Sequence, residues 1–172
     1  MLIVFSGLPG TGKTTIAREI ARQTRAVYLR IDVIEQAIRN AGVLAADVGT
    51  SGYGVANALA LSHLQLGHTV IADCVNPVRE SRSAWANVAT QASVDVLDIQ
   101  VICSDPQVHQ RRVETRSGDI AGLVPPTWQS VLDHEYEAWD EAPWTLDTAL
   151  LTVNQAVTLV IARLASTGLG NP

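Results

Sequence analysis

The sequence predicts an α/β protein built on a parallel sheet with helices on both faces. Short apolar runs rich in β-branched residues alternate with longer segments whose apolar residues recur at helical spacing. The first strand and the first helix flank a glycine-rich stretch at 7–15, and two later strands lead into Asp32 and Asp73. Strands that alternate with helices form parallel sheets covered on both faces.

Local signals set the expected boundaries of each element. We expect strands at 2–5, 27–31, 69–73, 96–103 and 144–147. We expect helices after the glycine-rich stretch through Ala21, at 33–41, at 55–66, from Asn76-Pro77 through Ala89, from Asp105-Pro106 through Arg116, along a face of Trp128, Val131, Leu132 and Trp139, and at 157–164. Gly42 and Gly67 end helices, and the glycine-rich residues 42–54 predict a loop.

The stretch Gly7-Leu8-Pro9-Gly10-Thr11-Gly12-Lys13-Thr14-Thr15, which we call the phosphate loop, matches G-x-x-x-x-G-K-[ST]. Its glycines allow backbone amides to approach a polyphosphate, and the following helix adds its free N–H groups and positive dipole end. Lys13, the only lysine in the chain, would reach the β- and γ-phosphates, and the Thr14 hydroxyl would bind Mg²⁺. The alternative is a strand-to-helix turn without a ligand.

Two carboxylates are expected beside this loop, because ligands of parallel sheets lie at the carboxyl ends of the strands. Asp73 ends an apolar strand, where it would hold Mg²⁺ through water; its alternative role is a turn or helix cap. Asp32 would orient an acceptor hydroxyl and take its proton; its alternative role is the N-cap of the helix at 33–41.

The densest basic cluster is the run 109–116, in which His109, Arg112 and Arg116 share one helical face. It precedes a polar segment at 117–126 that contains glycine and proline and that could close as a lid. An arginine on this helix could neutralise charge during phosphoryl transfer. The alternative is a solvated charged face.

Composition excludes several classes of protein. The 172 residues suit one domain, and a net charge of −5 argues against a general nucleic-acid binder. No apolar run is long enough to span a membrane, and the N-terminus lacks the basic start of a signal peptide. We therefore expect a cytoplasmic protein in which Cys74 and Cys103 are free thiols, although adjacent strands could bring them together.

The chain resembles the group of small P-loop kinases that holds adenylylsulfate kinases, gluconate kinases, chloramphenicol phosphotransferases and polynucleotide 5′-hydroxyl kinases. The phosphate loop carries most of the resemblance, and residues 70–85 are similar to the polynucleotide kinase pattern. The resemblance implies one P-loop NTPase domain over 1–172, with a five-stranded parallel sheet of order 2-3-1-4-5 and an arginine-bearing lid. It implies that Asp32 is the general base and that Arg112 and Arg116 are lid arginines.

The expected activity is transfer of the γ-phosphoryl group of ATP, with Mg²⁺, to a hydroxyl of a small molecule, by a monomer or homodimer. Polynucleotide kinases carry an arginine three residues after the catalytic aspartate, but here that position is Glu35, which would repel a phosphodiester. Four arginines leave room for a smaller anionic acceptor, namely Arg30, Arg39, Arg79 and Arg82. The alternatives are a polynucleotide 5′-kinase and an ATPase without a phosphorylated acceptor.

Overall fold

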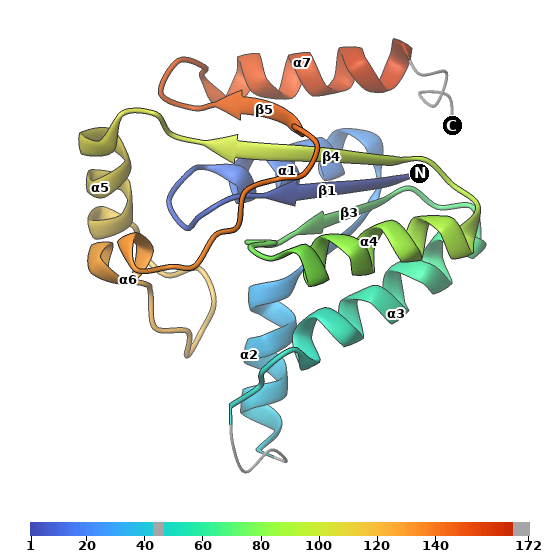
Figure 1. Ribbon diagram of the computed structural model, residues 1–172, viewed down its shortest axis with the longest axis horizontal. Coiled ribbons are helices and arrows are strands. Elements are labelled where there is room, and N and C mark those ends of the chain that lie inside the picture. The colour runs from blue at the N-terminus through green and yellow to red at the C-terminus, as the bar shows by residue number, and fades with distance from the viewer. Residues whose placement is uncertain (43–46, 167–172) are drawn as a thin grey trace.

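The computed structural model, which describes residues 1–42 and 47–166, contains one five-stranded sheet (Figure 1). Its strands are β1 (Leu2–Ser6), β2 (Val27–Arg30), β3 (Val70–Asp73), β4 (Val96–Ile102) and β5 (Trp144–Asp147). All neighbouring strands are parallel, and their order is β2-β3-β1-β4-β5. This confirms the predicted fold class and strand order.

Seven helices lie within the described residues. They are α1 (Lys13–Thr24), α2 (Ile31–Ala41), α3 (Ser51–Gln65), α4 (Arg79–Ala92), α5 (Pro106–Thr115), α6 (Trp128–Leu132) and α7 (Val153–Ser166). At α5 the Asp105 carboxylate accepts hydrogen bonds from the Gln107 and Val108 amides, with Pro106 in the first turn, as the cap signal predicts. None of the seven is long and apolar enough to cross a membrane.

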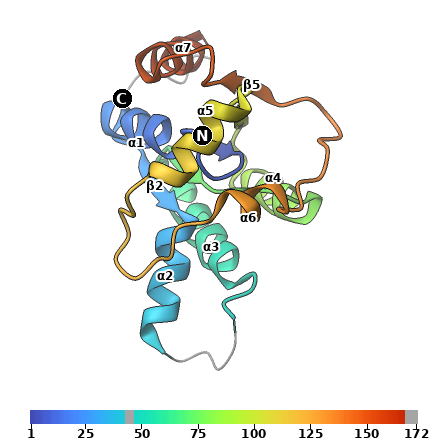
Figure 2. The same ribbon diagram turned by 90° about the vertical axis from the view of Figure 1, so that its left-hand side faces the viewer.

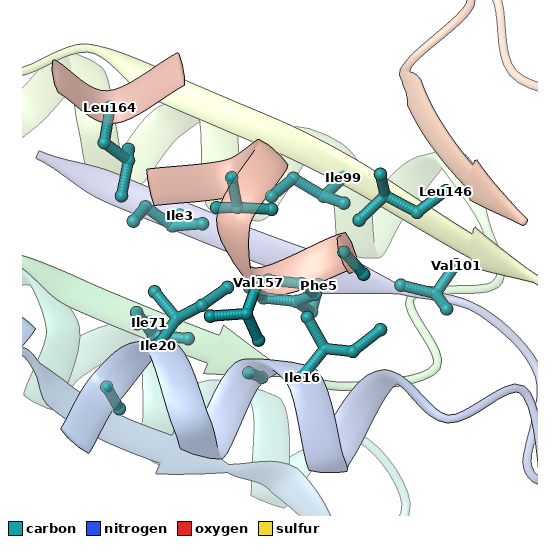
Figure 3. Close-up of a cluster of buried hydrophobic side chains, with 14 residues drawn as sticks. Ile3, Phe5, Ile16, Ile20, Ile71, Ile99, Val101, Leu146, Val157 and Leu164 are labelled. Atoms are coloured by element: carbon teal, nitrogen blue, oxygen red, sulfur yellow. The ribbon is translucent and has the colours of Figure 1, made fainter. Parts of the chain in front are cut away.

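The central strand β1 is buried on both faces and divides the core in two. Ile3 and Phe5 face α1 and α7, where they pack against Ile16 and Val157 (Figure 3). The alternate residues of β1 belong to the second cluster, on the side of α3 and α4, where Trp85 is fully buried. Because side chains alternate along a strand, one apolar strand supplies both layers of the core.

The remaining helices stand at the carboxyl ends of the strands. The arrowheads of β1 and β4 point toward α5 and α6, and the segment 117–126 joins these two helices along the same edge (Figures 1 and 2). The phosphate loop leaves β1 at this edge, and α2 begins there directly after β2. The fold therefore gathers the segments predicted to be functional at one edge of the sheet.

Three local predictions are wrong, and one alternative is excluded. Asp32 lies in the first turn of α2 and does not take the alternative role of N-cap, since Arg30 is the N-cap residue. Gly52 lies in α3, which begins before the predicted 55, while residues 43–46 of the predicted loop are outside the described residues. Asn76 precedes α4 with a left-handed φ of 52°, and Trp139 lies beyond the end of the five-residue α6.

Gly7 occupies a position that no other residue fits. Its φ is 141°, and an added Cβ would lie closer to the carbonyl oxygen of Val101 than real contacts allow. We expect Gly7→Ala to lower the free energy of unfolding by more than about 2 kcal/mol, because backbone strain and overpacking add. Thermal melting measures this loss.

Gly54→Ala is the matched control for Gly7→Ala. Gly54 lies in α3, is exposed, and a Cβ added to it would have nothing within 4 Å. Alanine favours helix over glycine by about 1 kcal/mol, so this variant should melt at or above the wild-type temperature. Equal losses in both variants would contradict the steric explanation for Gly7.

Candidate active site

The phosphate loop has the geometry of an anion-binding turn. Gly7, Gly10 and Gly12 all have positive φ, which side chains rarely adopt. Gly12 is the N-cap of α1 and supplies no side-chain hydrogen bond, so the first amides of the helix have no capping partner of that kind. Uncapped amides and the positive end of the helix dipole favour a phosphate at this place.

A cavity of about 540 Å³ opens in front of the loop. Six predicted nucleotide-binding residues line it, and Gly7, Leu8 and Thr11 lie outside its lining. The six are Pro9, Gly10, Gly12, Lys13, Thr14 and Thr15. Asp32, Arg112 and Arg116 line the same cavity, so the structure brings together all four residues predicted to be catalytic, Lys13 among them.

Arg30 has contacts that the sequence did not predict. Its side chain is 4% exposed, yet it lines the cavity at the end of β2. Its Nη2 donates to Asp32 Oδ2 (3.2 Å), and its Nε lies 3.9 Å from Asp73 Oδ2. This guanidinium therefore lies between the two predicted functional carboxylates and fixes the orientation of Asp32.

Asp119 ties the segment 117–126 to the body of the protein. Its Oδ2 accepts hydrogen bonds from Arg30 Nη1 and from Arg18 Nη2, each at 2.7 Å. These bonds, first that from Arg30, lower the pKa of Asp119 to about 2. The carboxylate thus stays charged at neutral pH, and the segment is held over the cavity from both α1 and β2.

Asp73 lies at the end of β3, is 2% exposed, and does not line the cavity directly. The Tyr28 hydroxyl donates to Asp73 Oδ2 at 2.6 Å, and burial raises the pKa of Tyr28, so this hydroxyl keeps its proton. Asp73 Oδ1 is buried and has no hydrogen-bond partner among the described residues. A buried carboxylate oxygen without a partner fits a role in holding a hydrated cation.

The two lid arginines differ in their surroundings. Arg112 donates from Nη1 to the Thr148 hydroxyl (2.7 Å) and from Nη2 to the Thr148 carbonyl (3.0 Å). Arg116 follows the last residue of α5, and within residues 1–42 and 47–166 it has no hydrogen bond or ion pair. Arg112 is therefore held against the cavity wall, whereas Arg116 is free to bind an anion.

Three of the arginines considered for an anionic acceptor are engaged elsewhere. Arg39 pairs with Glu35 (3.5 Å), and Arg79 pairs with Asp140 (2.8 Å). Arg82 donates to four backbone carbonyls and lies over the Trp139 ring, 4.1 Å from its centroid. None of the three lines the cavity, so Arg30 is the only one of the four that an acceptor in the cavity could meet.

Glu35, the position of the departure from polynucleotide kinases, packs between α2 and α3. A Cβ on Gly52 would overlap its side chain, so the two helices are in close contact here. Burial raises the pKa of Glu35, while the neighbouring Arg39 opposes this shift. Glu35 faces a helix contact and does not line the cavity.

The all-parallel 2-3-1-4-5 sheet with a phosphate loop after its first strand is the fold of the small P-loop kinases. The sequence pattern described as AAA domain matches residues 2–125, and the chain belongs to this family. No curated protein matches the sequence.

Solved structures show the same fold at low sequence identity. A protein from Chloroflexus aurantiacus is 23% identical, with a TM-score of 0.75, and the matched region covers 99% of this chain and 97% of that protein's chain. The Mycobacterium tuberculosis APS kinase in complex with AMPPNP and APS is 20% identical (TM-score 0.71; 95% and 96% covered). A sugar kinase from Janibacter sp. is 21% identical (TM-score 0.69; 99% and 98% covered).

Proposed function

We propose that this protein is an ATP- and Mg²⁺-dependent kinase that phosphorylates a hydroxyl group of a small molecule, acting as one domain with residues 117–126 as its lid. The observation that carries the proposal is the cavity shared by the phosphate loop and Asp32. In this shared cavity the Asp32 carboxylate can accept a proton from an acceptor hydroxyl close to the nucleotide phosphates. The similarity to an APS kinase and a sugar kinase supports a small-molecule acceptor.

The phosphate loop and its lysine would bind the nucleotide. The amides at the start of α1 would face the phosphates, and Lys13, which is 8% exposed, would place one positive charge beside them. The Thr14 hydroxyl and, through water, the free Oδ1 of Asp73 would hold Mg²⁺. The bound ion would neutralise charge on the β- and γ-phosphates.

Asp32 would act on the acceptor. Its Oδ2 is fixed by Arg30, which leaves Oδ1 to accept a hydrogen bond from the acceptor hydroxyl. As the hydroxyl oxygen bonds to the γ-phosphorus, the bond to the bridging oxygen of ATP breaks, ADP leaves, and the proton passes to Asp32. Closure of the segment 117–126 would keep water out, so that transfer competes with hydrolysis.

Arg116 is our choice for the arginine that stabilises the transferred phosphoryl group, because Arg112 is already bound to Thr148. We expect Arg116→Ala to lower kcat about 10- to 100-fold, the effect of one hydrogen bond to a charged group. Arg116→Lys should recover part of the loss, since it keeps the charge but not the planar fork.

Arg111→Ala is the matched control, because Arg111 is an exposed neighbour on α5 that does not line the cavity. Steady-state kinetics on the identified acceptor provide the measurement. A normal kcat in Arg116→Ala, or an equal loss in Arg111→Ala, would contradict the assignment.

Radiolabelled ATP separates the proposal from its two rivals. Protein and [γ-³²P]ATP are incubated with a pool of small metabolites, with a 5′-hydroxyl oligonucleotide, or with neither. We expect label in small molecules alone. Efficient, salt-sensitive labelling of the oligonucleotide would favour a polynucleotide kinase, and rapid release of labelled phosphate without any acceptor would favour an ATPase.

A further inference from the structure

His109 is a buried histidine that the proposed reaction does not use. It lies on α5, is 8% exposed, and places its Nε2 2.8 Å from the carbonyl oxygen of Pro9 in the phosphate loop. A carbonyl oxygen only accepts hydrogen bonds, so Nε2 must carry the proton. The ring also packs edge-on against Trp128, with centroids 5.1 Å apart, which holds its orientation.

The contact between α5 and the phosphate loop leaves no spare room. A Cβ on Gly10 would lie 2.5 Å from Val113 Cγ2 and 3.2 Å from His109 Cδ2. Gly10 therefore lets the helix lie directly on the loop. Because packed groups cannot move independently, the position of α5 restrains the loop backbone.

A second side chain restrains the loop two residues later. The Thr148 hydroxyl donates to the carbonyl oxygen of Thr11 (2.7 Å), closer than its other acceptor, the Ile102 carbonyl (3.1 Å). Arg112 of α5 in turn donates to this hydroxyl and to the Thr148 carbonyl. The carbonyl groups of Pro9 and Thr11 are thus both held by side-chain hydrogen bonds, the first from α5 and the second from Thr148.

These two hydrogen bonds determine where two amides point. The C=O and N–H of one trans peptide point in opposite directions across a rigid plane. Holding the Pro9 carbonyl toward α5 directs the Gly10 N–H the other way, and holding the Thr11 carbonyl toward Thr148 does the same for Gly12. Gly10 and Gly12 both line the cavity.

We propose that His109 is a positioning residue for the phosphate loop: its Nε2–H fixes the Pro9 carbonyl so that the Gly10 amide faces the bound phosphates. Thr148 does the same for the amide of Gly12. This inference rests on the proposed function, because it requires a nucleotide phosphate in the loop. It also means that the helix leading into the lid is the same helix that orients the loop.

The test compares two substitutions of His109 by titration with ADP. His109→Leu removes the donor at similar volume, and we expect the dissociation constant for ADP to rise about three- to tenfold, the effect of one hydrogen bond. His109→Gln keeps an N–H donor of similar reach and should remain within about twofold of wild type by the same scale. Melting without nucleotide should be alike in the two variants.

Thr148→Val and Thr148→Ser form an independent pair at the Thr11 carbonyl. Valine removes the hydroxyl donor and should weaken ADP binding, whereas serine keeps the donor and should bind ADP as wild type does. This pair provides the test if the His109→Leu protein folds poorly. Wild-type affinity in His109→Leu, or equal losses in His109→Leu and His109→Gln, would overturn the role of His109 alone. Failure of the wild-type protein to bind ADP would overturn the proposed function and this inference with it.

Discussion

Asp32→Asn is expected to lower the rate of phosphoryl transfer about 10²- to 10⁴-fold, the contribution of a general base. Asparagine has the shape of aspartate, and its side-chain oxygen can still accept the hydrogen bond from Arg30 that Asp32 Oδ2 accepts at 3.2 Å. It cannot take a proton from the acceptor. Single-turnover transfer from ATP to the identified acceptor measures the loss.

The loss in Asp32→Asn must appear in the chemical step and not in nucleotide binding. ATP affinity should stay within about twofold of wild type, because the proposed role of Asp32 is toward the acceptor and not toward the phosphates. Asp133→Asn, an exposed aspartate at the end of α6, is the matched control and should retain full activity. Full transfer by an Asp32→Asn protein that binds ATP normally would contradict the base assignment.

Lys13→Ala is expected to reduce phosphoryl transfer about 10²- to 10³-fold, comparable with the loss of one donor to a developing negative charge. Lys13 is buried in the cavity wall at the first position of α1, where no other lysine in the chain can replace it. The loop amides remain, so ADP should still bind, with lower affinity. Parallel titration and rate measurements separate the two effects.

Lys13→Arg distinguishes charge from shape at this position. Arginine keeps the charge, but its larger planar group does not fit a site in which the lysine is 8% exposed. We expect it to recover little of the activity lost in Lys13→Ala. Full activity in Lys13→Ala would contradict a role for the Lys13 charge in phosphoryl transfer.

Sequence patterns predicted the elements that depend on local signals. The five strands are apolar runs bounded by turn residues, and α5 begins at an aspartate followed by proline, so each carries its own evidence. The strand order came from the resemblance, since alternation alone does not determine it. The cavity residues Lys13 and Asp32 were predictable because parallel strands bring their carboxyl ends to one edge.

Long-range contacts account for what the sequence could not reveal. The hydrogen bond from Arg30 to Asp119 joins residues 89 positions apart, and no local pattern marks either partner. Gly52 was assigned to a loop, but it lies where α3 packs closely on Glu35 of α2, a place that requires glycine inside a helix. Such close approaches depend on the assembled fold.

The prediction of a helix that reaches Trp139 was wrong for a related reason. Its apolar spacing predicted a continued helix, but α6 ends at Leu132. Arg82 instead binds the carbonyl groups of Glu137 and Ala138, so this backbone finds its partners outside a helix. The hydrogen bonds from Arg82 thus stabilise a non-helical backbone where the apolar spacing predicted a helix.

Mass spectrometry of phosphorylated metabolites tests the kinase assignment most directly. The protein is incubated with Mg²⁺, ATP and small metabolites from the source organism, and Asp32→Asn is treated in parallel. With wild type we expect a metabolite to gain the mass of one phosphoryl group while ATP becomes ADP. With Asp32→Asn we expect far less of this product. Consumption of ATP to ADP and free phosphate with no such metabolite, at equal rates in both proteins, would contradict the kinase assignment.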